Sequence, residues 1–146
     1  MTAEPYLAQI ARTIQLSVAP VFLLTAIGTT LAVLTNRLGR IVDRAHKLED
    51  SVASRPPDEE SAVYAELSVL SRRARLINVA ITLGTVCALL ICVLIACMFI
   101  GAFFSVDIAT MVSLLFVTAM LSFIGALLSF LGEIYIAIRS LRIGMK

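Results

Sequence analysis

The sequence predicts an all-α membrane protein with three membrane-spanning helices, and two observations support this prediction. Hydrophobic residues make up 60% of the 146 residues and charged residues only 15%, whereas soluble domains contain about 25% charged residues. Residues 13–36, 76–106 and 108–132 contain no charged side chain. Each stretch is longer than the roughly 20 apolar residues that a helix needs to cross a bilayer core. We therefore expect one membrane domain over residues 1–146, with spans at about 14–36, 77–104 and 109–132.

The first span is expected to be a retained anchor rather than a cleaved signal peptide. No small-residue cleavage site follows it, and Asn36, Arg37 and Arg40 come directly after it instead. Beyond the span, apolar residues continue at helical spacing and form one stripe, which consists of Leu34, Leu38, Ile41, Ala45 and Leu48. The helix is therefore predicted to continue out of the membrane.

A second helical arm is predicted to return the chain to the membrane. Pro56 and Pro57 end the first arm, and proline is tolerated in the first turn of the helix that follows. A second apolar stripe has alternating spacings of four and three residues and consists of Val63, Leu67, Leu70, Ala74 and Ile77. The two stripes can pack antiparallel. We expect a helical hairpin over about residues 37–75, formed by extensions of the first two spans.

The distribution of Lys and Arg predicts the orientation of the chain. Eleven of the twelve lie either between the first two spans or in the C-terminal tail, and only Arg12 lies on the other side. Because basic residues collect on the cytoplasmic side, the hairpin and the C-terminus are predicted to be cytoplasmic and the N-terminus to be outside. The net charge of +2 is modest and gives no reason to expect a nucleic-acid partner.

The basic residues nearest the first two spans are expected to contact anionic phospholipid headgroups, at about 1 kcal/mol for each contact. They are Arg37, Arg40, Arg44, Lys47, Arg72, Arg73 and Arg75. The same residues also account for the predicted orientation of the chain, because basic residues collect on the cytoplasmic side.

Polar and small residues inside the spans form candidate faces for helix association or for an ion path. In the third span they follow helical spacing, and they are Thr118, Ser122, Gly125, Ser129 and Gly132. Thr25, Thr29 and Asn36 form a face of the first span, and Asn78 belongs to a similar face of the second. Packing within the chain, contact between subunits and pore lining all fit these faces.

Glu133 interrupts an otherwise apolar run near the predicted inner boundary of the membrane. A carboxylate at that depth is costly unless it is neutral, paired or in contact with water. An ion pair with Arg37 or a neighbouring basic residue, which would fix the helix register, is the main interpretation. A role in handling protons or cations is the alternative.

The sequence favours no enzymatic activity. None of the charge-free stretches contains a His or Lys that could act as a base for a Ser, Thr or Cys nucleophile. Cys87, Cys92 and Cys97 recur every five residues, which scatters them around a helix instead of bringing them together as metal ligands. We expect no catalytic residues, no cofactor and no metal.

Several short segments of the chain resemble domain-of-unknown-function family 2721, a family of small bacterial membrane proteins. The segments are Pro20-Val21-Phe22-Leu23-Leu24, Thr35-Asn36-Arg37-Leu38, Asp43-Arg44-Ala45, Arg72-Arg73, Asn78 and Glu133. The resemblance covers nearly the whole chain, from about Ile14 to Leu141. It implies a three-span protein of the bacterial inner membrane and implies no activity.

These observations lead to one functional prediction and two alternatives. The prediction is a non-enzymatic inner-membrane protein that forms a homo-oligomer through its small and polar helix faces. One alternative is an oligomeric ion channel or transport-related pore. The other is a membrane scaffold or accessory subunit whose basic hairpin binds anionic lipid or a cytoplasmic partner.

Overall fold

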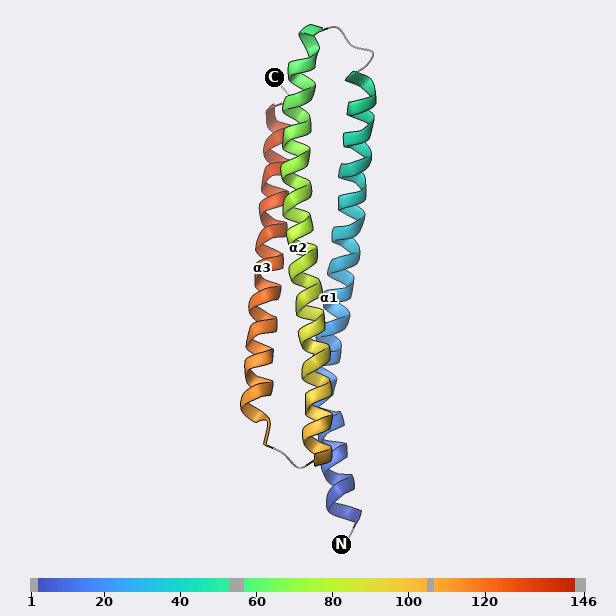
Figure 1. Ribbon diagram of the computed structural model, residues 1–146, viewed down its shortest axis with the longest axis vertical. Helices are drawn as coiled ribbons and strands as arrows, with labels where there is room; N and C mark the ends of the chain where they lie inside the picture. The colour runs from blue at the N-terminus through green and yellow to red at the C-terminus, as the bar shows by residue number, and fades with distance from the viewer. Residues whose placement is uncertain (1–2, 53–56, 105–106, 144–146) are drawn as a thin grey trace. The chain divides into compact units, whose positions relative to one another are not determined.

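The protein consists of three long α-helices in the computed structural model, which describes residues 3–52, 57–104 and 107–143 (Figure 1). α1 spans Ala3–Val52, α2 spans Pro57–Phe104 and α3 spans Ala109–Ile143. Each helix contains a segment that is long and apolar enough to cross a membrane. The predicted fold class, all-α with three candidate spans, is therefore confirmed.

The helix ends follow local sequence signals. α2 begins at Pro57, whose fixed φ suits a first-turn position where its missing N–H has no helical partner to lose. α3 begins after Asp107, and the backbone N–H of Ala109 donates a hydrogen bond to Oδ1 of Asp107 at 3.0 Å. Such a bond satisfies one of the donors that a helix N-terminus leaves unpaired. Pro20 lies inside α1 without ending it, as membrane helices tolerate.

The contacts divide the chain into two compact units, and each unit contains a segment of every helix. Unit 1 comprises Met1–Thr30 and Leu83–Ile124, and unit 2 comprises Leu31–Thr82 and Gly125–Lys146. In the sequence of unit 1 the only charged residues are Glu4, Arg12 and Asp107. All the other charged residues of the chain therefore belong to the sequence of unit 2.

Unit 1 has an apolar interior with a few satisfied hydroxyls. Its fully buried large side chains include Ile27, Cys87 and Ile91. Two buried hydroxyls, those of Thr13 and Ser17, donate to backbone carbonyls four residues earlier in α1, at 3.1 and 2.7 Å. These hydroxyls need no partner on another helix, because the backbone of their own helix already accepts their hydrogen bonds.

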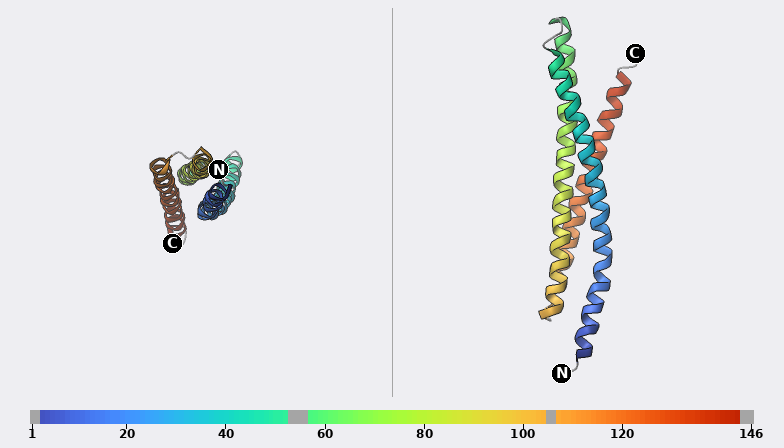
Figure 2. Two further views of the ribbon diagram at one scale, coloured as in Figure 1. Left: turned by 90° about the horizontal axis from the view of Figure 1, so that it is seen from below. Right: turned by 90° about the vertical axis from the view of Figure 1, so that its right-hand side faces the viewer.

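Unit 2 has a core in which the end of α1 packs against the beginning of α2, and these two segments run antiparallel side by side (Figures 1 and 2). The buried members of the core cluster are Leu34, Ile41, Leu70, Ile77 and Ala80. The partly buried residues around it include Leu38, Ala45, Leu48 and Ala74. The two apolar stripes therefore pack together as the sequence predicted, although Leu67 and Val63 do not belong to this cluster.

A cytoplasmic hairpin is not evident as a separate element. The charged segments are the continuous ends of α1 and α2, and residues 53–56, where the hairpin would turn, lie outside the described residues. Residues 105–106 of the predicted outer turn and the C-terminal Lys146 also lie outside them.

The three helices expose large apolar side chains along much of their length. Phe22 of α1 is 72% exposed, Leu89 of α2 is 61% exposed and Leu128 of α3 is 63% exposed. A monomer in water rarely exposes contiguous apolar surface on this scale. In a bilayer the same side chains would contact lipid.

Candidate functional site

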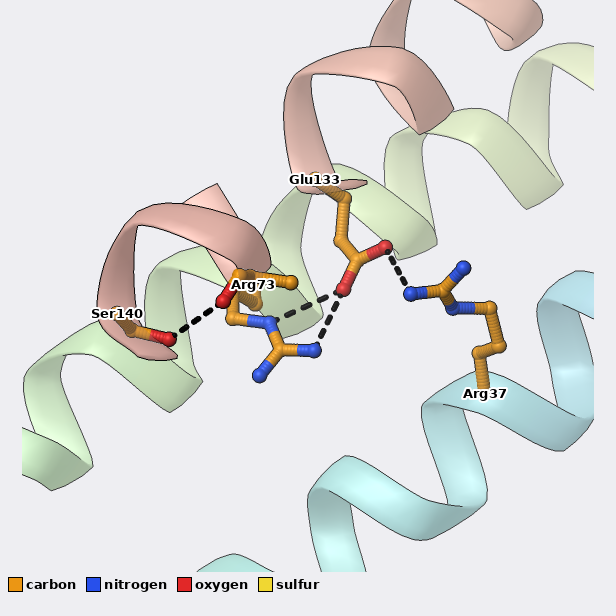
Figure 3. Close-up of polar contacts among 5 residues, drawn as sticks. Arg37, Arg73, Glu133 and Ser140 are labelled. Atoms are coloured by element: carbon orange, nitrogen blue, oxygen red, sulfur yellow. Dashed lines mark hydrogen bonds and ion pairs between the residues drawn. The ribbon is translucent and has the colours of Figure 1, made fainter. Parts of the chain in front are cut away.

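Glu133 is the centre of an ion-pair network that joins all three helix segments of unit 2 (Figure 3). Its side chain is fully buried. The Nε and Nη2 groups of Arg73 on α2 donate hydrogen bonds to Glu133 Oε1, at 3.0 and 2.8 Å. Nη2 of Arg37 on α1 lies 3.1 Å from Glu133 Oε2, close enough for an ion pair but without hydrogen-bond geometry. The carboxylate therefore has a cation on each oxygen.

The helical repeat of α3 explains why Glu133 points inward. Ala119, Ala126 and Glu133 follow one another at intervals of seven residues, and all three are buried. Residues seven apart lie on nearly the same face of an α-helix. Small side chains on this face let α3 approach its neighbours closely, so that the carboxylate reaches the guanidinium groups.

The carboxylate of this network is buried, whereas the two arginine side chains are partly exposed to solvent. Glu133 has no exposed surface, whereas the side chains of Arg37 and Arg73 are 27% and 19% exposed. Arg37 is also held by Phe130, whose ring centroid lies 5.3 Å from its guanidinium carbon. One carboxylate with two guanidinium groups leaves one formal positive charge in excess, and this excess faces outward.

Arg37 is a predicted partner of Glu133, and this ion pair is present. Arg73 has the better hydrogen-bond geometry, however, although its sequence position predicts only contact with lipid headgroups. The sequence feature that could have pointed to Arg73 is its position in the Arg72-Arg73 pair at the base of the second arm. Sequence spacing alone could not tell which of these arginines faces α3.

The other basic residues of the predicted lipid-contact set differ in their surroundings. Arg44 is paired with Glu66 through its Nε and Nη2 groups; the Arg44 side chain is largely exposed, and Glu66 is half-buried. The remaining four are exposed and have no carboxylate partner among the described residues, and they are Arg40, Lys47, Arg72 and Arg75. These four side chains therefore keep their guanidinium or ammonium groups outside any ion pair of the described residues.

Most candidate hydroxyls of the spans are bound to their own helix. Thr25, Thr29 and Thr118 are exposed, and each donates to the carbonyl four residues earlier, at 3.3, 3.0 and 2.8 Å. Ser122 differs, because its hydroxyl on α3 donates to the carbonyl of Leu83 on α2 at 2.8 Å. Ser122 therefore joins two helices of unit 1.

The remaining candidate residues for helix association or an ion path lie in unit 2. Ser129 is half-buried, and a Cβ added at Gly132 would meet Leu76 Cδ1 at 3.8 Å, so this end of the small-residue stripe lies against α2. Asn36 and Asn78 are exposed. Within the described residues, no group of three or more His, Cys, Asp and Glu side chains could hold a metal ion.

The fold and this site define an all-α protein with three helices that could each cross a membrane and with an arginine–carboxylate network in its charged unit. The chain belongs to the family described as protein of unknown function (DUF2721), which matches residues 17–143. No curated protein and no solved structure matches it.

Proposed function

We propose that the chain is a non-enzymatic, three-span protein of the bacterial inner membrane whose basic helix ends bind anionic lipid headgroups on the cytoplasmic side. The observation that supports this proposal is the exposure of Arg40, Lys47, Arg72 and Arg75, none of which forms an ion pair with a carboxylate of the described residues. Arg40, Arg72 and Arg75 lie within four residues of the charge-free stretches, at the level where headgroups lie in a three-span topology, and Lys47 lies further along the same helix.

In this proposal the ends of α1 and α2 form a cytoplasmic hairpin, and the spans anchor it. The Glu133 network fixes the three helix segments at the base of the hairpin, so that the basic surface is held in one arrangement. The spans also associate into a homo-oligomer through their small and polar helix faces. A cytoplasmic partner, in place of anionic lipid, is the alternative ligand of the hairpin.

An oligomeric ion channel receives less support from the contacts. The hydroxyls of Thr25, Thr29 and Thr118 already donate to backbone carbonyls, and both oxygens of Glu133 face arginines. A carboxylate that binds passing cations would need an oxygen open to the path. The lipid-binding proposal therefore takes precedence.

The lipid-binding experiment compares phosphatidylglycerol with zwitterionic phosphatidylcholine. Thermal unfolding of the purified protein in neutral detergent is followed with each lipid added. A ligand that binds only the folded state raises the melting temperature, so phosphatidylglycerol should raise it and phosphatidylcholine should not. The combined change Arg40→Gln, Lys47→Gln, Arg72→Gln and Arg75→Gln should remove the increase.

The matched control keeps the charge while changing the side chains. Arg40→Lys, Arg72→Lys and Arg75→Lys together should retain most of the stabilisation and its sensitivity to salt. Equal stabilisation by the two lipids, or full stabilisation of the neutralised variant, would overturn the lipid-binding proposal.

The topology is tested by labelling intact cells with a maleimide that does not cross membranes. Cys87, Cys92 and Cys97 are first replaced by Ala, and a single cysteine is then introduced by Ser61→Cys or Asp107→Cys, since both positions are exposed. Labelling of the Asp107 variant alone, with the Ser61 variant labelled only after permeabilisation, is the expected result. The reverse pattern would show that the basic ends lie outside.

A further inference from the structure

Four arginines line one concavity in unit 2. Its volume is about 370 Å³, and its lining consists of Arg37, Arg40, Ile41 and Arg44 from α1 with Leu70 and Arg73 from α2. The three arginines of α1 lie three and four residues apart, which places them along one face of the helix. Ile41 and Leu70 are buried members of the core cluster, so the part of the lining between the arginines is apolar and well packed.

Three of these arginines form ion pairs with carboxylates of residues that do not line the concavity. Glu133 binds Arg73 and Arg37, and Glu66 binds Arg44. A guanidinium group has five N–H donors, of which Arg73 and Arg44 each use two for their carboxylate. The unused donors stay available, and a side chain that is already fixed loses less conformational freedom when a ligand binds.

The charges around the concavity do not balance. Four guanidinium groups line the concavity, and three of them pair with two carboxylates, those of Glu133 and Glu66, which leaves a formal charge of about +2 among these six side chains. Arg40 is exposed and has no carboxylate partner in the described part of the chain. A ligand that neutralises this excess would carry two negative charges.

We propose that this concavity is a binding site for a phosphate monoester group, the chemistry shared by a phosphomonoester lipid headgroup and a soluble phosphate ester. A phosphate monoester carries about −1.5 to −2 charges at neutral pH and has three acceptor oxygens. Planar guanidinium groups bind such oxygens with paired N–H donors. The inference rests on the proposed function, because it names the headgroup chemistry that the basic helix ends select.

The test measures selectivity between two anionic lipids. Protein reconstituted in neutral nanodiscs is titrated with phosphatidic acid, a monoester, and with phosphatidylglycerol, a diester, and bound lipid is counted by native mass spectrometry. The expected result is at least tenfold tighter binding of phosphatidic acid. Arg40→Gln should reduce this preference about tenfold, and it should not prevent folding because Arg40 is exposed and unpaired within the described residues.

The control variant is Arg139→Gln, which removes one exposed positive charge from α3 outside the concavity. It should change the ratio of the two affinities less than twofold.

A second arm adds inorganic phosphate to the protein in neutral detergent, at an ionic strength matched with chloride. If phosphate raises the melting temperature and Arg40→Gln abolishes the increase, the group is recognised without a lipid, as in a soluble ester. If only phosphatidic acid binds, the lipid headgroup is the ligand.

Equal affinity for the two lipids would overturn the inference, and so would equal effects of Arg40→Gln and Arg139→Gln on their ratio. Stabilisation by phosphatidylglycerol would remain in those cases, and the proposed function would stand without a selective site. Absence of binding to any anionic lipid, and to phosphate, would overturn both the proposed function and the inference.

Discussion

Glu133 is a fully buried carboxylate that lies between two guanidinium groups, one from each of the other helices. Removing two charges from water costs several kcal/mol per ion, and a buried pair recovers this only with good geometry. The two hydrogen bonds from Arg73 provide that geometry on one oxygen. The network is therefore expected to be far more sensitive to loss of one partner than a surface ion pair.

The first prediction is that Glu133→Gln lowers the free energy of unfolding by about 3–5 kcal/mol, as is typical when one partner of a buried pair is removed. Glu66→Gln is the matched control, because its carboxylate and that of Glu133 each pair with arginine, but the Glu66 and Arg44 side chains are 40% and 66% exposed. The control should lose at most about 1 kcal/mol. Equilibrium unfolding in mixed micelles measures both, and equal losses would contradict the structural role of Glu133.

The two arginines are predicted to contribute unequally. In double-mutant cycles with Glu133→Gln, the coupling energy of Arg73→Gln should be near the upper end of the usual 0.5–3 kcal/mol range, and that of Arg37→Gln near the lower end. The reason is that Arg73 makes two hydrogen bonds, whereas Arg37 makes an ion pair without hydrogen-bond geometry. A larger coupling for Arg37 would show that the pair is arranged differently in the membrane.

The sequence identifies Glu133 because a single charge in an apolar run is visible without any structure. It also supports Arg37, which lies at a comparable depth on the first helix. It does not single out Arg73, because the rotation of α2 about its axis relative to α3 is set by packing between distant segments. Residue spacing within one helix carries no information about that rotation.

At the scale of helices, the two apolar stripes of α1 and α2 were readable from the sequence because a helical period makes a continuous face. The buried face of α3 was harder to read. The predicted stripe through Thr118 and Gly125 lies one residue away from the line of Ala119, Ala126 and Glu133 that is buried. Both of these neighbouring lines of α3 consist largely of small residues, so residue type does not show which line is buried.

Hydroxyls of α3 are predicted to differ in importance according to the acceptor that each one uses. Ser122→Ala removes a hydrogen bond between helices, from Ser122 to the carbonyl of Leu83, and should destabilise the protein by about 0.6–1.7 kcal/mol. Thr118→Ala removes a bond to the carbonyl of Leu114 in the same helix and should have an effect close to zero. Unfolding of both variants under identical conditions measures the difference, and equal effects would contradict a specific contribution from Ser122.

At the scale of the whole chain, charge is distributed very unevenly along the sequence. All but three charged residues belong to the sequence of unit 2, while the candidate spans expose large apolar side chains. In lipid, apolar surface gives little drive for association, and polar side chains without partners in the same chain are better candidates for subunit contacts. Asn78 is such a residue, because it is exposed inside a charge-free stretch and its side chain makes no hydrogen bond within the described residues.

The last prediction is that the protein in lipid nanodiscs has the mass of one defined homo-oligomer and that Asn78→Leu shifts it toward the monomer. Hydrogen bonds between membrane helices are worth about 1–2 kcal/mol in model peptides, which is enough to change an association constant at least several-fold. Val79→Leu is the control, because it changes an adjacent exposed residue and keeps the position apolar. A monomeric wild-type protein would remove any pore formed by self-assembly and leave lipid binding by the basic helix ends as the function to pursue, whereas an oligomer unaffected by Asn78→Leu would place the subunit contact on another face.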